Sequence, residues 1–332
     1  MNIIKIELSS TDLRNLNDNL LIEIDGLKNV VAKNRTGHNL SVFTFMRQII
    51  SKLVLHDKIR TSETYTCTLN SFKRFRNNND IELSEMTSEL MEEYESYLKG
   101  NHLSKNTCSF YMRILRAVYN QAVLKDMADD CKPFRNVYTG NEKTKKRAIP
   151  ISSIEAIKNA QISDDAIRYA RDMFLFSFYT RGMSFVDMAN LTYSDLKEDT
   201  LVYRRKKTNQ TLKIRWKQCM QDIIDRNPSL DGIHLLPIID GNKPNSRRQY
   251  KAKQLKVNEE LKKLSMMLCL NCNLIMYVAR HSWASIARDM NIPLSVISDS
   301  MGHDSEKTTR IYLTSINEGK IDEANDKILD NI

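Results

Sequence analysis

Glycine and proline are both scarce in this chain, with nine glycines and six prolines among 332 residues. Sandwiches, barrels and propellers need turn residues every few positions, so this scarcity excludes most architectures with many strands. Long apolar runs are also lacking, because the longest, 266–279, is interrupted by two asparagines and falls short of the ~20 residues of a membrane span. Charged side chains break up the N-terminal residues where a signal peptide would be apolar. We therefore expect a cytoplasmic protein with no membrane partner.

Cysteine is too sparse for a disulfide scaffold, since six cysteines are spread along the whole chain. Cys269 and Cys272 form a lone Cys-x-x-Cys pair, and no second pair or histidine follows at the spacing of a zinc site. The sequence therefore predicts reduced thiols, no metal site and no cofactor.

The charge that is present is basic, because 50 lysines and arginines face 41 aspartates and glutamates, for a net charge of +9. Residues 1–140 hold 19 basic and 17 acidic side chains, so the remaining 31 and 24 leave +7 for residues 141–332. This excess suggests a polyanionic partner, most simply nucleic acid, although many soluble proteins of similar charge bind none.

Residues 40–135 have apolar side chains at helical spacing in four successive segments and predict a small helical domain. The third segment stops at Gly100 and the fourth opens near Ser104. The aromatic residues of these segments are expected to form the core. Basic residues lie on the expected outer faces, namely Lys73, Arg74, Arg76, Arg113 and Arg116. Residues 1–39 precede this domain as a short extension.

A polar and basic stretch, residues 136–150, then interrupts the apolar pattern. It contains Gly140, Pro150 and the run Lys145, Lys146 and Arg147. Such a stretch between two periodic regions indicates an interdomain linker, which is either a solvated loop or a segment that lies along a DNA backbone.

Residues 151–332 predict a second, mainly helical domain. Ser152 and Glu155 have the spacing of a capping box, and helices are expected at 166–179, at 184–191 and from Asn258 onward. Two alternating segments on either side of Lys207 predict an antiparallel hairpin. The expected fold class is mostly α (α+β), with one small antiparallel sheet in the second domain.

Three residues near the C-terminus form the most specific pattern. Arg280, His303 and Tyr312 are separated by 23 and by 9 residues. Singly, a surface charge, a capping histidine and a packed tyrosine would explain them. Together, these residue types are difficult to explain by packing alone.

With this pattern the chain resembles the tyrosine recombinase, or phage integrase, family. The family pattern is Arg-His, then a Leu-Gly-His-type turn, then a tyrosine nine residues later, and this chain has Met301 in place of the leucine. Residues 178–196 resemble the first conserved box of the family, and Lys207-Thr208 resembles its hairpin lysine. The four N-terminal helices resemble its core-binding, DNA-binding domain.

The resemblance implies phosphoryl transfer on a DNA backbone. Tyr312 would attack the phosphate and store it as a phosphotyrosyl ester, and Arg280 would bind the oxygens of the anionic transition state. Lys207 would protonate the departing 5′-oxygen, and His303 would donate to a non-bridging oxygen. The covalent link conserves the bond energy, so the reaction needs neither metal nor nucleotide.

Two positions depart from the family pattern. Ser184 occupies the place of the first catalytic arginine, and we expect Arg181, three residues earlier, to supply that charge. Tyr277 occupies a place where the family often has a histidine, and its phenol can also donate to a phosphate oxygen. Both departures resemble a branch of bacterial invertases and conjugative-element integrases. Asp187 and His281 are expected to orient neighbours and to pack, respectively.

The resemblance therefore implies a site-specific recombinase that cuts and rejoins double-stranded DNA recombination sites, for integration, excision or inversion. Its expected assembly is a homotetramer on paired sites, in the cytoplasm at the nucleoid. Two alternatives remain: a type IB topoisomerase-like strand transferase, and a catalytically impaired DNA-binding accessory protein.

Overall fold

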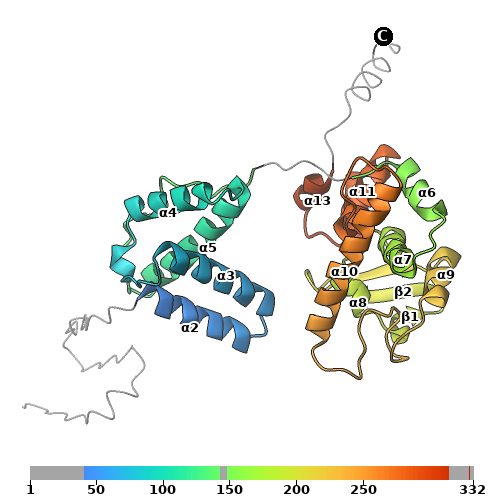
Figure 1. Cartoon of the computed structure of the whole chain (residues 1–332), viewed down its shortest axis with the longest axis horizontal. Helices are drawn as coiled ribbons and strands as arrows, with labels where there is room; N and C mark the ends of the chain where they lie inside the picture. Colours follow the sequence, from blue (N-terminus) through green and yellow to red (C-terminus); the bar gives the residue numbers. More distant parts are fainter. Residues whose placement is uncertain (1–40, 143–147, 314–328, 330–332) are drawn as a thin grey trace, which may run out of the picture. The chain divides into compact units, whose positions relative to one another are not determined.

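The computed structural model describes residues 41–142, 148–313 and 329, and they divide into two compact units (Figure 1). The first unit comprises residues 41–142 of the described chain and the second begins at residue 148. The run Lys145, Lys146 and Arg147 and the extension 1–39 lie outside the described residues. None of the described helices is long and apolar enough to cross a membrane.

Four helices form the first unit, as the apolar spacing predicts. They are α2 (Val42–Leu55), α3 (Ile59–Phe75), α4 (Ser88–Gly100) and α5 (Lys105–Leu124), with a short 3-10 turn, η1 (Leu83–Glu85), before α4. The side-chain oxygens of Ser41, Thr87 and Ser104 cap α2, α4 and α5 by accepting a backbone N–H three residues ahead. The buried aromatic and aliphatic side chains of all four helices form one core. The aromatic residues of this core therefore pack inward and do not form a base-stacking surface, whereas Tyr97 of α4 is 37% exposed and not part of the core.

The first unit continues past its last helix and beyond the domain boundary expected at residue 135. Phe134 and Val137 are buried in its core. Farther along, the amide of Glu142 donates to Oδ1 of Asn106 at 2.7 Å, which fixes the chain against the start of α5. These contacts place 136–142, part of the expected linker, in the first unit.

The second unit is built on two buried helices, α7 (Asp165–Tyr179) and α11 (Met276–Asp289). Between them along the chain come α8 (Phe185–Ala189), η2 (Tyr193–Asp195), the sheet, α9 (Gln218–Arg226) and α10 (Ser246–Met267). α6 (Ile151–Asn159) precedes them, and α12 (Leu294–Ser300) and α13 (Glu306–Tyr312) follow. Figure 1 shows α7 beneath α11 and α6 in this unit, with the sheet beside α8 and α9.

Two helix starts differ from the sequence prediction. α6 has Pro150 as its N-cap and no side-chain cap, so the capping box at Ser152 and Glu155 does not form. Pro150 already has the extended backbone of an N-cap residue, which places Ser152 inside the helix. α10 begins at Ser246 and not at Asn258. The sequence did not indicate this start, because the first three turns contain no buried residue and lack the apolar stripe that predicts a helix.

The predicted hairpin is present and belongs to a three-stranded antiparallel sheet. Its strands are β1 (Leu196–Lys197), β2 (Thr200–Arg204) and β3 (Thr211–Arg215), in the order β1-β2-β3. The register pairs Arg204 with Thr211, so residues 205–210 form the loop between β2 and β3. Leu201 and Tyr203 of β2 are buried on the inner face of the sheet.

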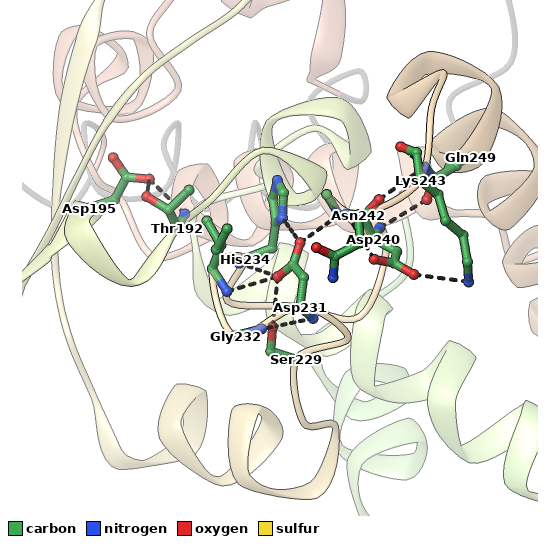
Figure 2. A network of polar contacts seen from close by, with 12 residues as sticks. Thr192, Asp195, Ser229, Asp231, Gly232, His234, Asp240, Asn242, Lys243 and Gln249 are labelled. Carbon is green, nitrogen blue, oxygen red and sulfur yellow. Dashed lines mark hydrogen bonds and ion pairs between the residues drawn. The ribbon is translucent and has the colours of Figure 1, made fainter.

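A buried carboxylate organises the segment between α9 and α10 (Figure 2). Oδ1 of Asp231 accepts from the backbone amides of Ile233 and His234 at 2.8 and 2.9 Å. Oδ2 accepts from the Gly241 amide at 2.7 Å and lies 2.5 Å from Nδ1 of His234. His234 in turn pairs its backbone with Thr192. With its carboxylate engaged on both oxygens, Asp231 fixes the path that leads into α10.

Candidate active site

Arg280 is a buried cation in α11, with 5% of its surface exposed. Its Nη1 donates to the carbonyl of Gly182 at 2.8 Å, and its Nη2 donates to the carbonyl of Met301 at 2.7 Å. Nη2 also lies 2.8 Å from Nε2 of His303. One guanidinium thus joins the turn after α7 to the turn after α12, and it brings two distant parts of the sequence pattern together.

Gly182 is required at this junction because the chain passes directly over Arg280. Its φ is +75°, and a Cβ at this position would lie 2.6 Å from the Cα of Arg280 and 2.8 Å from its Cβ. Any other residue would meet backbone atoms, which cannot move aside as a flexible side chain can. Arg181, immediately before it, also has a positive φ, of 61°. The chain therefore turns at 181–182, and α8 begins only afterwards.

His303 is buried, with 6% of its surface exposed, and it lies against Nη2 of Arg280. A guanidinium can only donate, so Nε2 of His303 accepts from Arg280, and Nδ1, 2.8 Å from Oγ1 of Thr309 in α13, carries the proton. Burial lowers the pKa of His303 to about 3, and the charges of Arg280, Arg205 and Lys207 add to that effect. The ring is therefore neutral near pH 7 in the protein without DNA.

Lys207 lies exposed in the loop between β2 and β3. Its charge acts on His303, so the two groups belong to one neighbourhood. Gln210 of the same loop donates through Nε2 to Oδ1 of Asp304 at 3.1 Å. The hairpin lysine, Arg280 and His303, which the sequence analysis selected from separate segments, therefore lie around the same two turns.

Arg205 is a site residue that the sequence analysis missed. It is 5% exposed and its Nη1 donates to the carbonyl of Gly302. The signal for it was the strand alternation, because Leu201 and Tyr203 point inward and the next residue on that face is Arg205. A cation in that position signals a specific buried partner.

Ser184 is fully engaged in local structure. As the N-cap of α8, its Oγ accepts from the Asp187 amide at 3.4 Å and donates to Oδ2 of Asp187 at 2.6 Å. Oδ1 of Asp187 accepts from the Lys206 amide at 2.9 Å. Asp187 therefore links α8 to the hairpin loop. This contact is consistent with the orienting role expected from the sequence.

Arg181 is half-buried, and its guanidinium has no hydrogen-bonding or ion-pairing partner within the described part of the chain. It nevertheless lies near the other cations. Burial and, to a smaller extent, Asp187 raise the pKa of Tyr203, while the charges of Arg280, Arg205 and Arg181 oppose that rise. Arg181 therefore belongs to the electrostatic neighbourhood of Arg280 and Arg205.

Tyr277 lies one helical turn before Arg280 on α11 and is 50% exposed. Its ring packs edge-on against the half-buried ring of His281, with 4.7 Å between centroids. The backbone of Tyr312 ends α13, three residues after Thr309, which contacts His303. The side chain of Tyr312 lies outside the description.

The basic residues of the first unit are partly engaged within it. Arg113 donates to the Ser109 carbonyl, Arg116 donates to Oγ1 of Thr139 at 2.9 Å, and Nζ of Lys73 lies over the ring of Phe43. Arg76 is half-buried. Arg74 is exposed, and it lines an open hollow together with Lys73, Cys67, Asn70 and Asn78.

Among the described residues, no group of three or more histidines, cysteines, aspartates or glutamates is placed to hold a metal ion.

Comparison with family models and with solved structures gives matches to known proteins. Residues 41–137 match the family model of the phage integrase SAM-like domain, nearly the same range as the domain expected at 40–135. Comparison with curated proteins gives no significant match.

Solved structures of similar fold cover most of the chain. The integrase of the Tn1549 transposon, solved with a circular intermediate DNA, is 16% identical and has a TM-score of 0.62, over 85% of this chain and 99% of its own. A lambda integrase dimer bound to a core site is 12% identical, with a TM-score of 0.63 over 82% and 95%. The XerH site-specific recombinase bound to a palindromic difH substrate is 17% identical, with a TM-score of 0.59 over 80% and 79%. Residues 41–137 are therefore similar to the phage integrase SAM-like domain, and the chain shares its fold with these two integrases and this recombinase.

Proposed function

We propose that this chain is a site-specific tyrosine recombinase that cuts and rejoins double-stranded DNA through a 3′-phosphotyrosyl intermediate on Tyr312, without a metal or other cofactor. The observation that carries the proposal is the convergence at Arg280. Its guanidinium binds the turns that hold Gly182 and Met301 and contacts His303, while the hairpin brings Lys207 to the same place.

The chemistry follows from this arrangement. The phenol of Tyr312 gives up its proton to solvent, and its oxygen forms a bond to phosphorus as the bond to the 5′-oxygen breaks. Lys207 gives the departing 5′-oxygen its proton. Arg280 presents a planar fork of donors to the non-bridging oxygens, where negative charge develops in the transition state. Attack by the freed 5′-hydroxyl of another strand then reverses these steps and releases the tyrosine.

His303 supports Arg280 before DNA arrives and can donate to phosphate afterwards. Donation requires the proton on Nε2, whereas Nε2 accepts from Arg280 in the DNA-free protein. The hydroxyl of Thr309 can either accept from Nδ1 or donate to it, so both tautomers keep their partner. We infer that an incoming phosphate draws Arg280 toward itself and that His303 changes tautomer at that moment.

Ser184 occupies the place of the first catalytic arginine, so another residue must supply that positive charge. We propose that Arg181 supplies it. The guanidinium of Arg181 shares the neighbourhood of Arg280, and Ser184 caps α8. The test is a pair of variants. Arg181→Ala is expected to lose most single-turnover cleavage, and adding Ser184→Arg is expected to restore part of it. Normal cleavage by Arg181→Ala would assign this charge to another residue.

DNA contacts by the first unit would come from Lys73, Arg74, Arg76, Arg113 and Arg116, and from the run Lys145–Arg147 if the linker follows the backbone. Arg74 is the most available of these, since it is exposed beside an open hollow.

We propose a homotetramer on paired sites. A lambda integrase of the same fold has been solved as a tetramer on a Holliday junction, which supports that assembly. A protein with this activity would act at the nucleoid.

The experiment that tests the function is covalent capture. A nicked suicide duplex that carries the recombination site traps the phosphotyrosyl adduct, because the released fragment diffuses away. Wild-type protein should form a protein–DNA adduct that survives denaturation and forms in EDTA, and Tyr312→Phe should bind DNA but form none. An adduct with Tyr312→Phe would contradict the assignment. Absence of an adduct with wild type would favour the accessory-protein alternative, and relaxation of supercoiled DNA of any sequence would favour the topoisomerase.

A further inference from the structure

Arg205 is a buried cation that the proposed chemistry does not use. It sits at the start of the loop that carries Lys207, one residue beyond the last β2 pair. Its amide donates to the Gln210 carbonyl at 2.8 Å, and its carbonyl accepts from the Asn209 amide at 2.8 Å, so its backbone closes the loop. Its side chain leaves the sheet, and Nη1 donates to the carbonyl of Gly302.

The loop and the turn before His303 fit closely around this contact. Gly302 has a φ of +63°, and a Cβ there would lie 3.0 Å from Leu212 and 3.3 Å from Cδ of Arg205. Oγ1 of Thr208 reaches the same carbonyl at 3.4 Å, a longer and weaker contact. The remaining tie, from Gln210 to Asp304, is exposed. Arg205 therefore makes the buried, charge-assisted bond of this junction, and it is the strongest of the three.

We propose that Arg205 is a positioning residue that locks the loop carrying Lys207 onto the Gly302–His303 turn. The inference rests on the proposed function, and it gives the hairpin lysine a fixed place before DNA binds. A lysine has three rotatable donors on a flexible stem, so an anchored loop reduces the number of positions that its ammonium can occupy. Arg205 and Arg280 are equally buried, at 5% exposure, so the comparison of leaving groups below, and not burial, distinguishes an anchor of the loop from a phosphate ligand.

The charges that act on His303 also indicate that the loop and the turn lie close together. The ring faces Arg280 of α11, Arg205 and Lys207 of the loop, and Thr309 of α13, with Asp304 next in sequence. On the other side of the loop the carboxylate of Asp187 holds the Lys206 amide. Burial is the main cause of the lowered pKa of His303, and loss of the Arg205 charge would remove one of the three cations that add to it.

The first measurement compares two leaving groups. Arg205→Met keeps the length of the side chain and removes its charge and donors, and Arg215→Met removes an exposed charge from the far end of β3 as a matched control. On an oxygen-bridged substrate we expect Arg205→Met to cleave at least about tenfold more slowly than wild type, as for a displaced general acid. A 5′-bridging sulfur needs no proton to leave, so this substrate should restore most of the rate, as it should for Lys207→Ala. Arg215→Met should behave as wild type on both substrates.

A second measurement needs no catalysis. Hydrogen exchange of the DNA-free protein should accelerate in Arg205→Met for the amides of the loop and, together with them, of the Gly302–His303 turn, by about tenfold for one lost charge-assisted bond. The rest of the second unit should be unchanged, which also shows that the variant is folded. Arg205→Lys keeps a charge with a different donor geometry and should give intermediate values in both measurements.

The outcomes distinguish failure of the proposed recombinase function from failure of the proposed role of Arg205. If wild type forms no adduct but exchange of loop and turn accelerates together, the proposed function fails and the lock stands. If Arg205→Met slows cleavage equally on oxygen and sulfur substrates, Arg205 acts on the phosphate and not on Lys207, and the proposal is overturned. Unchanged exchange at loop and turn would overturn it as well.

Discussion

Replacement of Gly182 by alanine would test how closely the chain approaches Arg280. The substitution adds one methyl group where φ is +75° and where that methyl would lie 2.6 Å from the Cα of Arg280. An L-residue with a left-handed backbone costs about 1–2 kcal/mol. Insertion of a methyl group into a packed junction costs about 1–3 kcal/mol more, because α7 and α11 must separate. Gly182→Ala should therefore lower the free energy of unfolding by about 2–5 kcal/mol.

Gly232 provides a control that separates these two contributions. Its φ is +72°, nearly the same, yet a Cβ there would meet nothing within 4 Å. Gly232→Ala should therefore cost the backbone term alone, about 1–2 kcal/mol. Urea unfolding of both variants measures the difference, and equal slopes would show that the unfolded states expose similar surface.

Activity gives the second readout for this pair. The Gly182 carbonyl accepts from Nη1 of Arg280, so a shift of the turn should also displace the guanidinium. Gly182→Ala should cleave at least tenfold more slowly than Gly232→Ala at a temperature where both are folded, because a preorganised donor typically contributes about 10²–10³ in rate. Equal stability losses and equal cleavage rates for the two alanine variants would refute the close approach.

Three further predictions concern the same site. Arg280→Ala should reduce single-turnover cleavage by about 10²–10³, and a loss below tenfold would exclude Arg280 from the phosphate clamp. The neutral state of His303 should make stability fall as pH falls from 6.5 toward 3, because the unfolded chain then takes up a proton that the folded protein refuses; the difference in unfolding free energy between wild type and His303→Gln should shrink across that window, and a pH-independent difference would contradict it. DNA affinity should fall with salt at a log–log slope of roughly −0.9 for each phosphate contact, measured by titration, and a slope near zero would contradict binding through lysine and arginine.

Local sequence patterns predicted most of the elements, because they are fixed by local rules. Apolar spacing and caps such as Ser104 determine where the helices of the first unit lie, and the alternation about Lys207 determines the hairpin. The start of α10 was missed because its first turns are held by helix-favouring residues without an apolar face. The capping box at Ser152 was wrong because Pro150 starts the helix two residues earlier.

The site was predictable only where its chemistry demands particular residue types. Arg280 and His303 were selected by type and spacing, and Lys207 by its resemblance to the family's hairpin lysine, and all three lie around the same turns. The need for glycine at position 182 depends on the tertiary approach to Arg280, which no local rule contains. The strand alternation places Arg205 on the inner face of the sheet, but its carbonyl partner is 97 residues away in the sequence and no local rule identifies it.

The serine at position 184 acquires a reason once these contacts are combined. Its hydroxyl caps α8 and holds Asp187, whose other oxygen holds the amide of Lys206 at the hairpin loop. An arginine at this position would remove the cap, at a cost of about 1 kcal/mol. It would also free the Asp187 carboxylate to pair with a cation of the site. With Ser184 the carboxylate stays bound to its own helix and to the Lys206 amide. If Arg181 supplies the missing positive charge, as we propose, Asp187 is then not available to pair with it. Ser184 thus replaces the arginine of the family pattern with a residue that restrains Asp187. Ser184→Ala removes this restraint without adding charge. It should therefore slow cleavage by more than the loss of the helix cap alone would explain.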